Sequence, residues 1–134
     1  MTEYLIDLPW PDRNLQSNAR CHWDKKSRLT NSARGTAKLL ARLKGVKVPM
    51  PDATIEIEYY PRNRRGDVHN VPSSLKAYID GIADAMGCDD KRFIVKYPDK
   101  FAGITKLGSV IFHIKPKTVI LPIAGTIQNL KGAA

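Results

Sequence analysis

Three segments of this chain alternate apolar and polar residues with a period of two. In the segment 53–60, Ile55 and Ile57 fall on one side, and Glu56 and Glu58 fall on the other. That period is typical of a strand with one buried and one exposed face. Other segments repeat apolar residues at helical spacing. The chain is therefore expected to fold as α/β (α+β), with a mixed, largely antiparallel sheet packed by two main helices.

Further strands are expected on both sides of this segment in the chain. Residues 93–97 and 110–114 alternate in the same way. The turn-like segment between them predicts that the two strands pair with each other in antiparallel orientation. Residues 3–8 form another short strand, which ends at Pro9 and Pro11 because proline cannot continue a ladder of hydrogen bonds.

The first expected helix begins at Thr30, Asn31 or Ser32, each of which can cap a helix N-terminus. It runs to about Lys44, and Gly45 supplies the left-handed residue just past its end. The residues expected to face the core are Ala33, Ala37, Leu40 and Leu43.

A second helix is expected between Pro72, which suits a first turn, and Gly87, which stops the helix. Its apolar residues recur at helical spacing and define one buried face. They are Val71, Leu75, Tyr78, Ile79, Ile82 and Met86.

The chain of 134 residues is long enough for one domain with a core of its own. We expect that domain to cover residues 1–115 and to be followed by a tail, 116–134, which packs on the domain or on a dimer partner. Residues 12–28 are polar and Asn-rich, and they are expected to form an irregular loop anchored by Trp10 and Trp23.

The charge of the chain favours a polyanionic partner. Its 22 Lys and Arg residues outweigh 13 acidic residues, which gives a formal net charge of +9 and a pI near 9.7. Nucleic acid is the leading candidate, although a solvated basic surface is the plain alternative. The residues expected to bind DNA are Arg13, Arg20, Lys25, Lys26, Arg62, Arg64 and Arg65.

Other compartments and ligand classes fit the sequence less well. No apolar stretch approaches the ~18 residues of a membrane span, and the chain opens with Glu3 and Asp7 rather than with a signal sequence. Cys21 and Cys88 have neither the number nor the spacing of a disulfide framework or a zinc site. A cytoplasmic protein without a membrane partner is expected.

Acidic residues flank the second helix. Asp67 and His69 precede it, and Asp89 and Asp90 follow it. If the sheet brought both loops to one edge, these side chains would form the hard ligand set that Mg²⁺ or Mn²⁺ prefers, next to a cluster of arginines suited to phosphate esters. The alternative is that these aspartates only cap turns and helices.

Lys76 precedes Asp80 by one helical turn, and the plain interpretation of this spacing is a surface ion pair. Lysine before aspartate is the less favourable order for such a pair. A lysine beside a phosphate could instead offset the charge that grows on a phosphorane.

Taken in order, these motifs resemble the RusA-type Holliday junction resolvases, a family of crossover junction endodeoxyribonucleases. Leu8-Pro9-Trp10-Pro11 with Asn14 is similar to the family's opening L-P-x-P-x-x-N, and Asp67-Val68-His69-Asn70 to its D-x-D-N. Lys76-x-x-x-Asp80-Gly81 is similar to its K-x-x-x-D-(A/G), and Asp89-Asp90 to its closing D-D. The resemblance covers residues 4 to about 115.

This resemblance implies a small α/β domain that forms a homodimer and cuts four-way DNA junctions symmetrically with Mg²⁺. It implies that Asp67 and Asp90 are catalytic metal ligands, that Asp89 supports or shares that role, and that Lys76 assists at the scissile phosphate. His69 stands where the family usually has aspartate. An imidazole ligand there would favour Mn²⁺ over Mg²⁺.

The leading hypothesis is a metal-dependent hydrolase of recombination, repair or phage DNA processing. A homodimer would supply two cuts related by two-fold symmetry. The alternative is a non-catalytic binder of branched DNA with a degenerate metal site, for which His69 is the feature in favour. A structural or regulatory dimer that binds duplex DNA or RNA is a third hypothesis.

Overall fold

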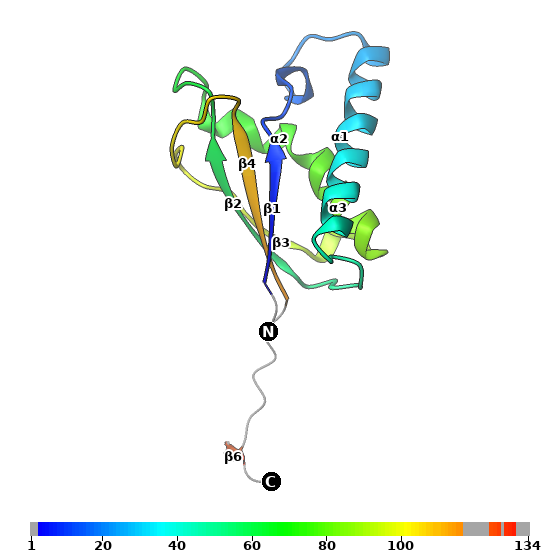
Figure 1. Cartoon of the computed structure of the whole chain (residues 1–134), viewed down its shortest axis with the longest axis vertical. Helices are drawn as coiled ribbons and strands as arrows, with labels where there is room; N and C mark the ends of the chain where they lie inside the picture. The colour runs from blue at the N-terminus through cyan, green and yellow to red at the C-terminus, as the bar shows by residue number, and fades with distance from the viewer. Residues whose placement is uncertain (1–2, 117–123, 127, 131–134) are drawn as a thin grey trace.

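The central sheet has four strands in the order β1-β4-β2-β3. A computed structural model describes residues 3–116, 124–126 and 128–130 of the chain (Figure 1). The strands of this sheet are β1 (Tyr4–Pro9), β2 (Thr54–Tyr60), β3 (Ile94–Lys96) and β4 (Ser109–Lys115). Strand β4 is antiparallel to both β1 and β2, whereas β3 is parallel to β2.

The helices cover one face of this sheet (Figure 1). The α-helices are α1 (Trp23–Leu43), α2 (Val71–Ser74) and α3 (Lys76–Met86). Three single turns of 3₁₀ helix are η1 (Arg13–Leu15), η2 (Val68–Asn70) and η3 (Asp90–Arg92). A separate two-stranded sheet pairs β5 (Ala124–Thr126) with β6 (Gln128–Leu130).

The core lies between the helices and the inner face of the sheet. Alternate residues of each long strand are fully or almost fully buried, as the period of two requires. Alanines of α1 and most of the apolar face of α3 pack against them. The largest fully buried side chains are Tyr59, Phe112, Ile6, Leu8, Ile55, Leu75, Ile82, Met86, Ile114, Val46 and Val110.

Helices α1 and α3 meet at Gly81. A Cβ atom at this position would overlap the carbonyl oxygen of Arg34 and would lie 2.9 Å from Cβ of Ala37. Only glycine permits this approach. The contact fixes how the first half of α3 lies against α1.

The α+β class is confirmed, and so are the strands at 3–8 and 53–60 and the helix stop at Gly87, whose φ is +74°. The predicted antiparallel pairing of 93–97 with 110–114 is wrong. Strand β3 pairs with β2 instead, because the connection between β3 and β4 is not a hairpin but packs along β2, where Ala102 N donates to Tyr59 O at 2.8 Å.

The start of the first helix was predicted about seven residues too late. Helix α1 begins at Trp23 and is capped by His22, whose Nδ1 accepts a hydrogen bond from the backbone of Asp24 at 3.2 Å. Residues 23–28 are therefore helical rather than irregular. Leu43 was expected in the core but is 72% exposed, because it lies on the last turn of the helix.

Of the two predicted anchors of the 12–28 segment, one is correct. Trp10 packs against the core, whereas Trp23 is 73% exposed. Most of the expected tail, 116–134, lies outside the described residues. Within the part of the chain that the structure describes, no helix has the length and hydropathy to cross a membrane.

Candidate functional site

Lys76, the first residue of α3, lies between two carboxylates. Its Nζ donates to Oδ1 of Asp80 at 2.8 Å and also to Oδ2 of Asp90, which η3 brings next to α3. The lysine side chain is 62% exposed, whereas the two aspartates are about one quarter exposed. Two motifs that are separate in the sequence, one on α3 and one at η3, therefore meet at one ammonium group.

The charge of this lysine is stabilised by its partners. The hydrogen bond to Asp80, followed by that to Asp90, raises the pKa of Lys76 above its usual value. In turn, the hydrogen bond from Lys76 lowers the pKa of Asp90. At neutral pH, Lys76 is therefore a cation and Asp90 an anion, so this lysine cannot serve as a general base.

A second ion pair lies beside the first. Arg34 of α1 binds Asp84 of α3 through two hydrogen bonds, Nε to Oδ2 at 2.5 Å and Nη2 to Oδ1 at 2.9 Å. This pairing lowers the pKa of Asp84, and the charge of Arg34 also interacts with Asp80 and Asp90. We call Arg34, Lys76, Asp80, Asp84 and Asp90 the Lys76 cluster; it contains two cations and three carboxylates.

A cavity of about 240 Å³ adjoins the Lys76 cluster. Its polar walls come from the segment after η1, from α1 and from α2, with Ser17, Lys26, Thr30 and Ser73 next to Lys76 and Asp80. The segment after η1 is held there because Ser17 N donates to Oγ of Ser73 at 3.0 Å. The cavity leads from the Lys76 cluster towards the first turns of α1.

Asp67 occupies a different position. It caps η2, where its Oδ1 accepts a hydrogen bond from the backbone N of His69 at 2.9 Å, and both residues are exposed. His69 thus lies within a 3₁₀ turn that Asp67 caps. Asp67 lines a second cavity, of about 280 Å³, together with Arg13 and Arg62.

The parallel pairing of β2 with β3 explains why the two acidic loops do not meet at one edge of the sheet. Asp67 follows the end of β2, whereas Asp90 precedes β3, whose first residue, Ile94, pairs with Thr54 at the start of β2. The sheet therefore does not bring the two acidic loops to one edge, which was the condition for the predicted metal cluster.

The donor atoms themselves are of the type that Mg²⁺ prefers. Asp67 and Asp89 each use Oδ1 to cap a 3₁₀ turn, as the alternative interpretation predicted, and each retains a second carboxylate oxygen. Asp90 is held by Lys76. Among the described residues, no group of three or more His, Cys, Asp and Glu side chains is placed to hold a metal ion.

Most of the residues expected to bind DNA lie at one end of the domain. They come from the segment around η1, the start of α1 and the loop after β2, which lie together at the end where β1 and β2 finish (Figure 1). All are exposed except Lys26, which is half-buried and donates from Nζ to O of Gln16 at 3.4 Å. This basic end comprises Arg13, Arg20, Lys25, Lys26, Arg62, Arg64 and Arg65.

Helix α1 carries a stripe of cations that is only partly available to a ligand. Arg34, Lys38 and Arg42 recur at helical spacing, but Arg34 is bound to Asp84, and the charge of Lys38 also lowers the pKa of that carboxylate. Arg34 and Lys38 therefore balance the acidic face of α3 before they can meet a phosphate.

Sequence reasoning missed the acidic face of α3. Asp80 and Asp84 follow Lys76 at successive intervals of four residues, a spacing that could have identified all three as one stripe. The partnership between Arg34 and Asp84 joins two helices and has no such signal. The hydroxyl of Tyr59 is fully buried and has no hydrogen-bond partner among the described residues, and no sequence pattern indicates this either.

Comparison with known proteins gives one relative to report. An uncharacterized protein of Xylella fastidiosa is 40% identical over 94 residues, which are 66% of this chain and 61% of that protein. The matched region is thus less than two thirds of the relative's length. No family model matches the chain.

Proposed function

We propose that the protein is a metal-dependent endonuclease that resolves four-way DNA junctions by paired, symmetric hydrolysis of phosphodiester bonds. The observation that carries this proposal is the contact of Lys76 with Asp90, two residues 14 positions apart whose motifs resemble catalytic motifs of the RusA-type resolvases. The α+β fold and the basic end also support it.

Lys76 would act as a fixed positive charge. Its raised pKa keeps the ammonium protonated, so it can stabilise the negative charge that develops on a phosphorane. To do so, it must exchange one of its carboxylate partners for a phosphate oxygen. Asp80 can retain it through this exchange, because the two residues are one turn apart on the same helix.

A divalent cation is part of the proposal. Asp67, Asp89 and Asp90 are the oxygen donors that would hold it, with His69 as a nitrogen donor. When bound, the ion would neutralise phosphate oxygens and lower the pKa of a bound water. Asp90 would then have to be released from Lys76, which frees the ammonium for the phosphate.

The basic end would hold the arms of the junction by their phosphates, and a homodimer would supply two such ends related by two-fold symmetry. A position in the cytoplasm, where the DNA is found, belongs to the same proposal.

A non-catalytic binder of branched DNA is the second candidate. Two observations favour it. Lys76 donates a hydrogen bond to a carboxylate oxygen of Asp90 that a metal ion would need, and residue 69 is a histidine rather than an aspartate. Such a protein would use the basic end alone.

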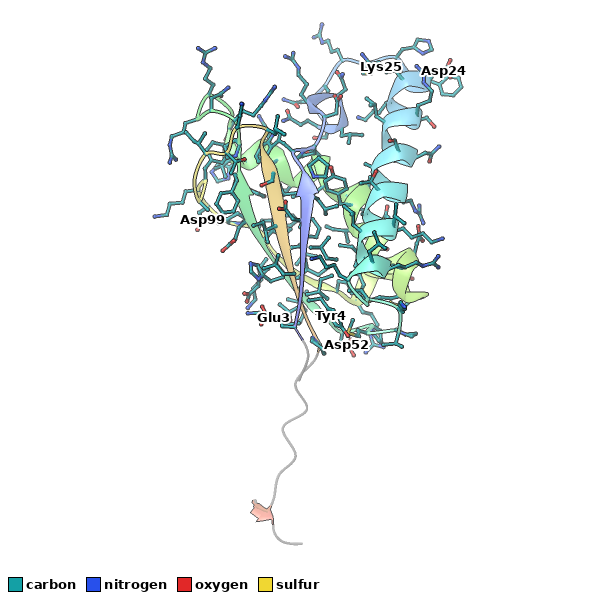
Figure 2. The ribbon with its side chains drawn as sticks, viewed as in Figure 1. Glu3, Tyr4, Asp24, Lys25, Asp52 and Asp99 are labelled. Atoms are coloured by element: carbon teal, nitrogen blue, oxygen red, sulfur yellow. The ribbon has the colours of Figure 1, made fainter. Side chains whose placement is uncertain are left out.

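Incubation of the purified protein with a labelled four-way junction and with a matched linear duplex, in Mg²⁺, Mn²⁺ or EDTA, separates the two candidates. We expect paired cuts in the junction alone, and none in EDTA. Asp67→Asn and Asp90→Asn should each abolish cleavage and leave junction binding intact or tighter, because each removes a negative charge. Asp99→Asn, on a loop on the side of the sheet away from α1 (Figure 2), is the matched control and should cleave normally.

Junction binding without cleavage in any divalent ion would favour the non-catalytic binder. Equal affinity for the junction and the linear duplex, again without cleavage, would contradict both candidates. Loss of binding in Asp67→Asn and Asp90→Asn, with normal folding, would show that these carboxylates have a structural role instead.

A further inference from the structure

The fold packs one of its two tryptophans against the core and leaves the other in solvent. Trp10 packs edge-on against Tyr59 and Phe101, with ring centroids 6.1 and 6.3 Å apart. Trp23, on the first turn of α1, is 73% exposed. An exposed indole contributes little to the stability of this domain, so its aromatic face is available for a ligand.

The indole of Trp23 belongs to a small aromatic surface of fixed geometry. The ring of His22 stacks on it, with centroids 6.0 Å apart and an interplanar angle of 26°. The orientation of His22 is set in turn by the cap of α1, in which Nδ1 accepts from the backbone of Asp24. We call His22 and Trp23 the aromatic platform.

Basic residues flank the aromatic platform in the sequence. Residues 20–28 contain four Lys or Arg residues and one Asp, and three of these cations, Arg20, Lys25 and Arg28, are exposed. Asp24 and Lys25 lie at the outer end of α1 (Figure 2). A polyanion is therefore attracted to the point where the aromatic face is presented.

A single nucleobase fits this surface better than a lipid bilayer or an apolar protein surface. Among the described residues, Trp23 is the one large apolar side chain left exposed on the first half of α1. A membrane anchor or an interface core needs several such residues together. One flat ring among cations matches one base with phosphates on either side, the arrangement used by proteins that bind single strands.

The aromatic platform also lies in line with the Lys76 cluster. Residues 23, 26 and 30 share one face of α1 by their helical spacing, and Lys26 and Thr30 line the cavity that contains Lys76 and Asp80. Trp23 and Thr30 are about 10 Å apart along the helix axis, at ~1.5 Å per residue. A strand whose base stacks on Trp23 therefore has only a few phosphates to span before it reaches Lys76.

We infer that His22 and Trp23 form a stacking site for one unpaired nucleobase of a DNA strand that continues along α1 towards Lys76. This inference rests on the proposed function for its ligand, but it does not require that the protein cleave DNA. Its physical basis is base stacking on an exposed indole, with affinity supplied by the neighbouring cations.

Tryptophan fluorescence tests the inference directly, because the chain has two tryptophans and Trp10→Phe leaves Trp23 as the only one. The protein is titrated in EDTA with a single-stranded oligonucleotide and with a fully paired hairpin of equal charge. We expect the single strand to quench the emission of Trp23 and the paired hairpin to leave it nearly unchanged. If Trp10→Phe folds poorly, the difference between wild type and Trp23→Phe reports the same residue.

Affinity gives a second measurement, by fluorescence anisotropy of a labelled oligonucleotide. Trp23→Ala should weaken binding of the single strand about tenfold and binding of the hairpin much less, since one stacked base is lost. Trp23→Phe should retain most of the affinity. Leu39→Ala, which removes another exposed apolar side chain of α1, is the matched control and should bind as wild type does.

Saturable binding of the single strand without any change in Trp23 emission would overturn the inference, and so would a failure to bind DNA at all. Quenching by anionic phospholipid vesicles but not by the oligonucleotide would assign the platform to a membrane surface instead. Quenching by the single strand together with an uncut junction would leave the stacking site in place and contradict only the proposed nuclease activity.

Discussion

Gly81→Ala and Gly35→Ala make the same chemical change on the two packed helices, with opposite expected effects. At Gly81, a methyl group would overlap the carbonyl oxygen of Arg34 and lie 2.9 Å from Cβ of Ala37. To relieve that overlap, the two helices must separate by roughly 1 Å. Overpacking of this kind should lower the unfolding free energy by about 3 kcal/mol. The higher helix propensity of alanine returns about 1 kcal/mol. The net loss of unfolding free energy should be about 2 kcal/mol.

Gly35 has no atom within 4 Å of the position of its added methyl group, and it lies inside α1. Gly35→Ala should therefore stabilise the protein by about 0.5 to 1 kcal/mol. Urea denaturation followed by circular dichroism measures both changes, and the two variants should differ by about 3 kcal/mol. Equal effects of the two substitutions would refute the close approach of α1 and α3 at Gly81.

Four other predictions concern the charged groups. Lys76→Ala should reduce the rate of single-turnover cleavage of the junction by at least about 100-fold and change the unfolding free energy by less than ~1 kcal/mol. An unchanged cleavage rate would exclude this lysine from the site. His69→Asp should shift the preferred ion from Mn²⁺ towards Mg²⁺, measured as the ratio of cleavage rates, whereas His69→Ala with normal rates in both ions would exclude the imidazole as a ligand. Because Arg34 lowers the pKa of Asp84, the stabilisation from this pair is present above about pH 4 and is lost as the pH falls through the lower folded pKa. In urea titrations, Arg34→Met should therefore be less stable than wild type at pH 7 but approach its stability near pH 2. A difference in stability that is constant with pH would argue against the pair. Log affinity for the junction should fall linearly with log salt, by about 0.9 per phosphate contact, and Arg62→Gln should reduce that slope by roughly 1; a nearly flat salt dependence would contradict electrostatic binding at the basic end.

Alternation identified the strands of the sheet because it reports which side chains face the core. Ile55 and Tyr59 are buried on β2 as their spacing predicts. Alternation does not report which strand is the neighbour, and for this reason the pairing of β3 was wrong. That pairing depends on the long connections before and after β3, whose paths are set by packing.

Helix boundaries could be predicted where proline or glycine marks them, as at Pro72 and Gly87. The start of α1 could not, because its first turns extend beyond the core and carry no apolar period. In the site, the spacing of Lys76 and Asp80 indicated their ion pair. The contact of Lys76 with Asp90 could not be predicted, because it depends on the path of the chain after α3.

The position of β1 affects how the domain can form during synthesis. Strand β1 pairs only with β4 in the central sheet, with Tyr4 opposite Ile114. A ribosome must therefore release nearly all of the domain before the first strand has a partner, and β1 stays unpaired until β4 has emerged. Closure of so long a loop is entropically unfavourable until the core can compensate for it. Completion of the sheet is thus expected to wait for β4, and to be slow because its contacts are far apart in the sequence.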